Sequence, residues 1–162
     1  MSNRIKKKFE KNGKKLITFI TGGDPDLDTN FEILKIAINN VDILEIGMPF
    51  SDPMADGPII QESSVRSIDK GTKIGDIFDL VKKLRNLNSE IPIILMGYYN
   101  SIFNLGIENF ISKCASAGVD GLIIVDLQPE EDTELHTQAK EKNIDLIRLI
   151  TPTTDQDRLN TI

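Results

Sequence analysis

The sequence contains few of the residues on which metal sites, disulfide frameworks and nucleophilic triads depend. Its 162 residues include one cysteine, Cys114, one histidine, His136, and no tryptophan. A single cysteine excludes a disulfide framework or multi-cysteine metal site within the chain, and a single histidine leaves little for a zinc site or a histidine-based triad. We therefore expect no metal. Cys114 is expected in the buried stripe of a helix, and His136 on the surface.

Long hydrophobic runs are also missing. No apolar run approaches the roughly 20 residues needed to cross a bilayer, which excludes a membrane span. The basic segment at residues 6–8 leads into no apolar stretch of the kind found in a signal peptide, so the cytoplasm is the expected location. With 40% hydrophobic and 27% charged residues, residues 1–162 are typical of one globular domain or of part of a larger one.

Basic residues are concentrated at the amino terminus. Seven of the 19 lysines and arginines lie in the first 15 positions, and the remaining chain holds 12 basic residues against 24 acidic ones. Duplex nucleic acid is bound through a basic face, so this acidic body argues against a nucleic-acid partner. The basic segment fits the solvated face of a short helix whose Ile5 and Phe9 point inward. Contact with a membrane or a partner is the alternative.

Short apolar runs alternate with longer amphipathic segments along the whole chain. The runs are nearly continuous and rich in β-branched residues, as expected for strands buried on both faces of a parallel sheet; they span residues 16–21, 41–47, 91–97, 121–126 and 144–150. Helical spacing predicts helices from a cap at Asp28 to Asn39-Asn40, over 74–84, over 107–114 with a stop at Gly118, over 130–142, and beginning within 155–162. This alternation predicts an α/β fold with right-handed crossovers.

Two architectures compete for this pattern, a doubly wound open sheet and a TIM (β/α)₈ barrel. A dinucleotide-binding sheet would place G-x-G-x-x-G after the first strand, but residues 21–25 read TGGDP. Polar residues instead follow the carboxyl ends of several strands, which is the active face of a barrel; they are Asp24, Glu45, Tyr98, Asn100 and Asp126. We therefore favour the barrel. A complete barrel needs about 250 residues, so we expect only about its first five β/α units here, with the carboxyl-terminal units missing.

Two carboxylates are the main candidates for chemistry. Glu45 lies near the end of an otherwise apolar strand, where an unpaired carboxylate costs several kcal/mol unless it is protonated or paired. A raised pKa with an acid/base role and an ion pair with a lysine or arginine are both open. Asp56 precedes Gly57-Pro58 in the stiff, proline-rich loop 48–58 and can point back over the strand end. Ordinary turn formation is its alternative, and for Asp52 it is the better explanation.

Two carboxylates in different surroundings can take opposite acid/base roles without a metal or organic cofactor. Such a pair suits proton transfers that make or break a carbon–carbon bond, or an isomerisation. Glycoside hydrolysis also uses two carboxylates, so the pair by itself does not choose among these reactions.

Residues 44–61, LEIGMPFSDPMADGPIIQ, contain the long pattern E-[IL]-G-x-P-F-S-D-P-x-A-D-G-P-x-I-Q and strongly resemble the tryptophan synthase α subunit family. Segments 19–25 (FITGGDP), 98–106 (YYNSIFNLG) and 117–126 (AGVDGLIIVD) support the resemblance. It covers essentially the whole chain, but only about the first three-fifths of the family's barrel. The resemblance implies a lyase that cleaves indole-3-glycerol phosphate by a retro-aldol reaction into indole and glyceraldehyde 3-phosphate.

By the same motif, the resemblance implies the roles of the two carboxylates. Glu45 matches the acid/base glutamate that moves protons at the indole C3 and the glycerol hydroxyl. Asp56 matches the aspartate that interacts with the indole N–H as positive charge develops on the ring.

The resemblance also implies a substrate pocket and a partner. Phe19, Met96 and Tyr98 match positions near the indole ring, and Pro49 and Asp52 fall in the loop directed towards a β subunit. That β subunit would receive indole in an α₂β₂ assembly and would alone carry pyridoxal phosphate. The family's phosphate-binding backbone and closing loop are expected beyond Ile162, which leaves a non-catalytic docking module as the alternative function.

Overall fold

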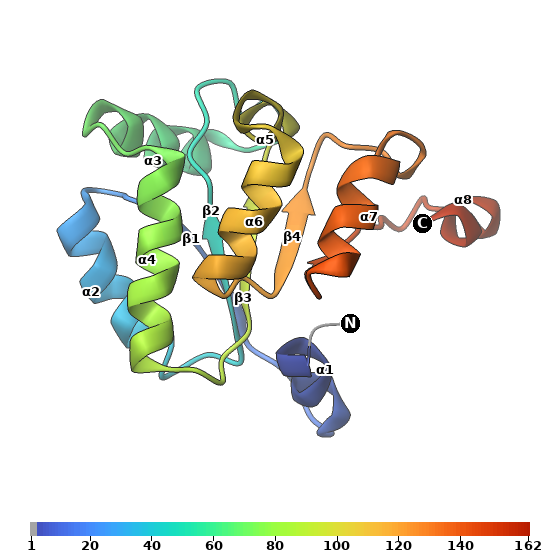
Figure 1. The fold of residues 1–162 in the computed structure, drawn as a ribbon, viewed down its shortest axis with the longest axis horizontal. Helices are drawn as coiled ribbons and strands as arrows, with labels where there is room; N and C mark the ends of the chain where they lie inside the picture. Colours follow the sequence, from blue (N-terminus) through green and yellow to red (C-terminus); the bar gives the residue numbers. More distant parts are fainter. Residues whose placement is uncertain (1–2) are drawn as a thin grey trace.

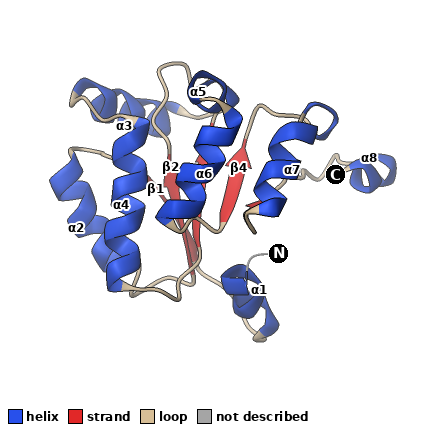
Figure 2. Ribbon diagram, in the orientation of Figure 1, coloured by secondary structure: helices blue, strands red, loops and turns tan. Residues whose placement is uncertain are grey.

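A computed structural model describes residues 3–162 and shows one parallel sheet flanked by helices (Figures 1 and 2). The strands are β1 (Ile17–Thr21), β2 (Ile43–Gly47), β3 (Ile93–Gly97), β4 (Gly121–Ile124) and β5 (Asp145–Leu146). The helices are α1 (Asn3–Glu10), α2 (Leu27–Ala37), α3 (Pro58–Asp69), α4 (Ile74–Leu87), α5 (Tyr99–Leu105), α6 (Ile107–Ala117), α7 (Thr133–Glu141) and α8 (Gln156–Thr161). A short 3₁₀ turn, Pro129–Glu131, precedes α7.

The order of the strands decides between the two predicted architectures. The sheet runs β1-β2-β3-β4-β5, and each strand pairs in parallel with the next one in the sequence. A doubly wound sheet would instead reverse its strand order at a switch point. Helices α2, α4, α6 and α7 lie in a row over one face of the sheet, and α1 lies beyond the amino-terminal ends of the strands (Figure 1). This one-directional winding is that of a (β/α) barrel.

The side chains on the two faces of the sheet form two separate apolar clusters. Side chains alternate between the faces of a strand, so that Leu44 and Ile46 of β2 pack towards the covering helices. Ile43, the first residue of β2, points to the opposite, inner face of the sheet, where it packs with Ile94 and Ile5. Helix α1 therefore contributes a side chain to the inner face of the barrel wall.

A buried carboxylate joins three elements at the amino-terminal end of the sheet. Asp120 accepts hydrogen bonds from the Ile93 amide at the start of β3 (3.0 Å) and from Arg4 of α1 (3.0 Å). It also pairs with Arg85 of α4. Arg85 donates further to the carbonyl oxygens of Gly118 (2.8 Å) and Ile91. This network ties α1 and α4 to the sheet at the end opposite the site described below.

The predicted helices are present, with two corrections to the residues assigned to them. Phe9 was predicted to point inward, but 57% of its surface is exposed and it belongs to neither cluster. In α1 it is Ile5 that reaches the inner face, and Phe9 lies one turn further along. Asp28 was predicted to cap α2, but the cap is Asp26, whose extended backbone lets its carboxylate accept from the Thr29 amide (2.9 Å).

The last strand is shorter than predicted. Residues 144–150 were expected to form it, but β5 is Asp145–Leu146, and Leu149 and Ile150 are exposed. Within residues 3–162 the sheet ends at β5, so its outer edge has no strand to pair with. Helices α3 and α5 were not predicted. The predicted stop after α6 is confirmed, with Gly118 in the left-handed conformation at a φ of 88°.

Candidate active site

Glu45 points to the inner face of the sheet at the centre of β2. It is in register with Phe19 of β1 and with Ile94 of β3. The side chain is half-buried, and within the described residues it makes no hydrogen bond or ion pair. Burial alone therefore raises the pKa of the Glu45 carboxyl above its ordinary value. Of the two alternatives that the sequence left open, the structure shows the unpaired carboxylate.

A small cavity opens at the carboxyl ends of β1 to β3. Its volume of about 20 Å³ is room for about one water molecule. Phe19, Met96 and Tyr98, the predicted substrate residues, line this cavity together with Asp56. Glu45 is not among the lining residues, although Phe19, its register partner on β1, is. The structure thus brings together four of the five predicted catalytic and substrate-binding residues, and Glu45 lies beside Phe19 on the neighbouring strand without lining the cavity.

Glycine at the end of β2 allows this arrangement. A Cβ atom on Gly47 would lie 2.6 Å from Cζ of Phe19, closer than non-bonded carbon atoms approach. A Cβ atom on Gly97, at the end of β3, would lie 2.8 Å from Cε of Met48. The aromatic ring of Phe19 therefore extends across the neighbouring strand only because that strand ends in glycine.

Tyr98, which directly follows β3, holds Asp56 in place through its hydroxyl group. The Tyr98 hydroxyl donates a hydrogen bond to Oδ2 of Asp56 (2.8 Å) and accepts one from the Ala55 amide (3.0 Å). Its ring stacks on Phe50 with the centroids 5.1 Å apart. Burial, followed by the hydrogen bond to Asp56, raises the pKa of Tyr98 to about 12. The phenol therefore keeps its proton near neutral pH and remains a donor. Sequence reasoning placed Tyr98 in the pocket wall and missed this contact.

Helix α3 anchors the loop that carries Asp56. Gln61 donates its side-chain amide to the carbonyl oxygen of Asp56 (2.8 Å). Ser63 shares a hydrogen bond with Thr21 (2.6 Å), and Ser67 donates to the carbonyl oxygen of Gly22 (2.7 Å). The sequence contained a signal for these contacts, because Ser63 and Ser67 are four residues apart and therefore share one face of a helix.

The two predicted partner-facing residues, Pro49 and Asp52, do not line the cavity. Asp52 is exposed, accepts a hydrogen bond from Ser51, and belongs to a turn in which the Met54 amide donates to its carbonyl oxygen. Pro49 is half-buried. Met54 and Ile59 on the same segment are largely exposed. This surface is open to contact, while Asp56 on the same loop faces the cavity.

The structure also shows the surroundings of three other residues singled out from the sequence, Cys114, His136 and Asp126. Cys114 is fully buried in α6, and burial raises the pKa of its thiol, so the predicted core position is confirmed. His136 is exposed on α7, as predicted. Asp126 accepts a hydrogen bond from the Tyr99 amide (2.8 Å) and so caps the start of α5.

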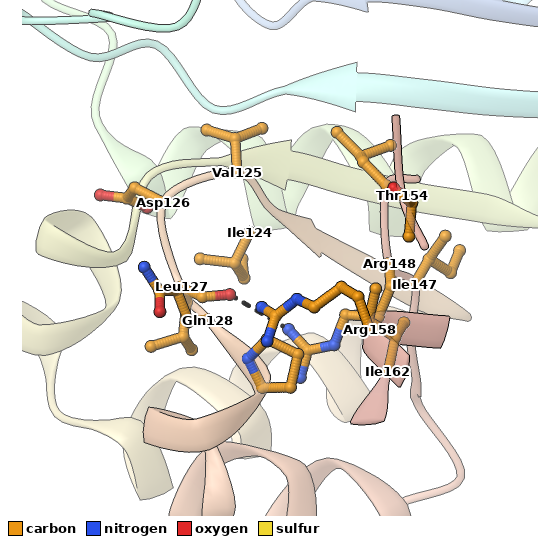
Figure 3. A pocket seen from close by; sticks show the side chains of 12 residues that line it. Ile124, Val125, Asp126, Leu127, Gln128, Ile147, Arg148, Thr154, Arg158 and Ile162 are labelled. Atoms are coloured by element: carbon orange, nitrogen blue, oxygen red, sulfur yellow. Dashed lines mark hydrogen bonds between the residues drawn. The ribbon is translucent and has the colours of Figure 1, made fainter. Parts of the chain in front are cut away.

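A larger cleft of about 270 Å³ lies beyond the ends of β4 and β5 (Figure 3). Arg148 and Arg158 both line it, and Arg148 donates to the carbonyl oxygen of Leu127 (3.2 Å). Each guanidinium has a carboxylate partner, Asp132 for Arg148 and Glu130 for Arg158. The cations of this cleft are thus already engaged, and none of the predicted site residues lines it.

Residues 3–162 contain neither a cluster of metal-binding side chains nor a helix that could span a membrane. No three histidine, cysteine, aspartate or glutamate side chains in this range lie close enough together to hold a metal ion. In the same range, no helix has the length and apolar character required to cross a membrane.

The fold and the site together define a class of protein. A parallel sheet wound in barrel order presents on its inner face a carboxylate with no partner within residues 3–162. A second, tethered carboxylate lies at the carboxyl ends of the strands, where barrels carry out chemistry. The chain belongs to the tryptophan synthase alpha chain family, whose model matches residues 5–162.

Individual relatives agree with this membership. The tryptophan synthase alpha chain of Geotalea uraniireducens is 50% identical over 154 residues, which cover 94% of this chain and 57% of the relative. The solved alpha subunit from Legionella pneumophila superposes with a TM-score of 0.92 at 37% identity, covering 99% of this chain and 63% of that one. A tryptophan synthase complex from Pyrococcus furiosus gives 0.87 at 39% identity, covering 91% and 61%. The predicted barrel class is confirmed, and the chain spans about three-fifths of the length of these relatives.

Proposed function

We propose that this chain carries the acid/base carboxylates of the tryptophan synthase α reaction, the retro-aldol cleavage of indole-3-glycerol phosphate into indole and glyceraldehyde 3-phosphate. The observation that carries the proposal is Glu45, a half-buried carboxylate with a raised pKa and no partner in the described residues, on the inner face of a barrel wall. Such a group can hold a proton closer to neutral pH than an exposed glutamate can.

The two carboxylates divide the chemistry between them. Glu45 donates a proton to the indole C3 and takes the proton of the glycerol hydroxyl next to the ring. The bond between C3 and the side chain then breaks, its electron pair returns to the ring, and the hydroxyl-bearing carbon becomes the aldehyde. Asp56 accepts the hydrogen bond of the indole N–H, and its negative charge stabilises the positive charge that develops on the protonated ring. No cofactor is needed for these steps.

The remaining predicted residues form the wall of the substrate pocket or the surface that faces the partner. Phe19, Met96 and Tyr98, which line the cavity, form the apolar surface for the indole ring. We place the phosphate-binding backbone and the closing loop outside residues 1–162. Because the energy of binding a remote phosphate positions the reacting end of a substrate, their absence would lower turnover as well as affinity.

The partner is a β subunit, in an α₂β₂ assembly in the cytoplasm, with pyridoxal phosphate only in the β subunit. Pro49 and Asp52 lie on the side of the loop that would meet it. The exposed Met54 and Ile59 beside them favour a second candidate function, in which this chain docks on a β subunit without cleaving substrate.

Indole release from indole-3-glycerol phosphate, measured with and without a β subunit, tests the proposal. We expect release above that of Asp56→Asn, and we expect Glu45→Gln to remove it, because proton transfer by a positioned acid contributes about 10²–10⁴-fold. Asp52→Asn is the matched control, since it changes the other aspartate of the same loop outside the cavity. Wild-type turnover in Glu45→Gln would overturn the proposal. Stimulation of the β reaction without indole release would support the docking function.

A further inference from the structure

The two carboxylate oxygens of Asp56 are in different situations. Oδ2 accepts the hydrogen bond of the Tyr98 hydroxyl at 2.8 Å. Oδ1 makes no hydrogen bond within the described part of the chain. The residue lines the cavity at the ends of β1 to β3, so the carboxylate is tethered by one oxygen and leaves the other free to accept.

The tether comes from a buried side chain at the end of a central strand. Tyr98 directly follows β3, only 4% of its surface is exposed, and its ring stacks on Phe50. Its hydroxyl also accepts the hydrogen bond of the Ala55 amide at 3.0 Å. One aromatic side chain at the end of a central strand therefore contacts three residues of the loop 48–58. Without it, Asp56 would depend on the short turn Pro53–Asp56 and on the Gln61 contact to its carbonyl oxygen, neither of which orients the carboxylate.

We propose that Tyr98 is a positioning residue, whose hydroxyl orients Asp56 so that its other oxygen is presented to an N–H donor bound at the carboxyl ends of β1 to β3. The inference rests on the proposed function and extends it, because it gives Tyr98 a role through Asp56 in addition to that of an apolar wall. A carboxylate aimed in advance loses no orientational freedom when the reaction begins.

The test removes one oxygen atom. Tyr98→Phe keeps the ring and its stacking on Phe50 but deletes the hydroxyl. Tyr99→Phe is the matched control, because it makes the same change at the next residue, whose hydroxyl has no hydrogen bond within residues 3–162. The first readout is hydrogen exchange of the Ala55 amide, followed by NMR, which requires no activity. The second is the division between kcat and KM for indole release, alone and combined with Asp56→Asn.

We expect Tyr98→Phe to speed exchange of the Ala55 amide about tenfold and Tyr99→Phe to leave it unchanged. We expect kcat to fall by roughly 10- to 100-fold with little change in KM, as for a lost hydrogen bond to a charged group. In the Asp56→Asn background the same change should cost almost nothing further.

Unchanged Ala55 exchange, or effects of Tyr98→Phe and Asp56→Asn that simply multiply, would overturn the inference. If the wild-type chain released no indole, the proposed function would fail for this chain, while the exchange readout would still decide the tether.

Discussion

The buried carboxylate of Asp120 supports a quantitative prediction. Its side chain is only 3% exposed and faces the guanidinium of Arg85, which is 10% exposed. Asp120→Asn keeps the size and removes the charge. Breaking a buried ion pair on one side leaves an uncompensated charge and costs about 3–5 kcal/mol. We therefore expect the free energy of unfolding to fall by about that amount.

Three of the contacts of Asp120 contribute differently. Arg4 is 36% exposed, so solvent screens it and its pair with Asp120 contributes little. The Ile93 amide can still donate to the oxygen of asparagine. Among these three contacts, the one with Arg85 therefore accounts for most of the loss. With a urea m-value of about 2 kcal/mol/M, the midpoint of unfolding should fall by roughly 1.5–2.5 M.

Urea unfolding followed by circular dichroism measures this shift. The matched control is Asp79→Asn, which removes an exposed pair with Lys82 three residues away (3.1 Å) and should cost under about 0.5 kcal/mol. Adding Arg85→Met to Asp120→Asn should recover part of the loss, because the unpaired cation is then gone. A midpoint shift in Asp120→Asn no larger than that of the control would refute the reasoning.

Three further predictions concern stability. Burial raises the pKa of Glu45 in the folded chain, so the folded state binds the proton more tightly than the unfolded state does. The free energy of unfolding therefore falls as pH rises from about 4.5 through the folded pKa. In thermal melts at a series of pH values, Glu45→Gln should raise the Tm at neutral pH and not below pH 4. Gly47→Ala places a methyl group against Phe19 and should cost about 1–3 kcal/mol in urea unfolding, and a neutral result would mean that the ring moves aside freely. Asp26→Ala should lower the Tm more than Asp28→Ala does, because Asp26 caps α2, and equal shifts in the two melts would contradict that cap.

The predictable part of the site came from local pattern. Glu45 stands out because a charged residue interrupts an apolar strand, and Asp56 because it lies in a long specific motif just beyond that strand. Neither observation depends on a distant residue. The pattern left open whether Glu45 is paired, since a partner could come from any element, and the structure shows it unpaired within residues 3–162.

The sequence by itself determined the strands, most helices, the barrel class and the two carboxylates, because apolar periodicity and motif spacing are properties of neighbouring residues. Only the tertiary structure decided which side chains meet. Tyr98 and Asp56 are 42 residues apart, and Arg4 and Asp120 are 116 apart. Phe9 remained exposed because the inner face of the sheet accepts Ile5 instead. Contacts across such separations depend on how the strands are ordered and how far each side chain reaches, and local sequence carries neither.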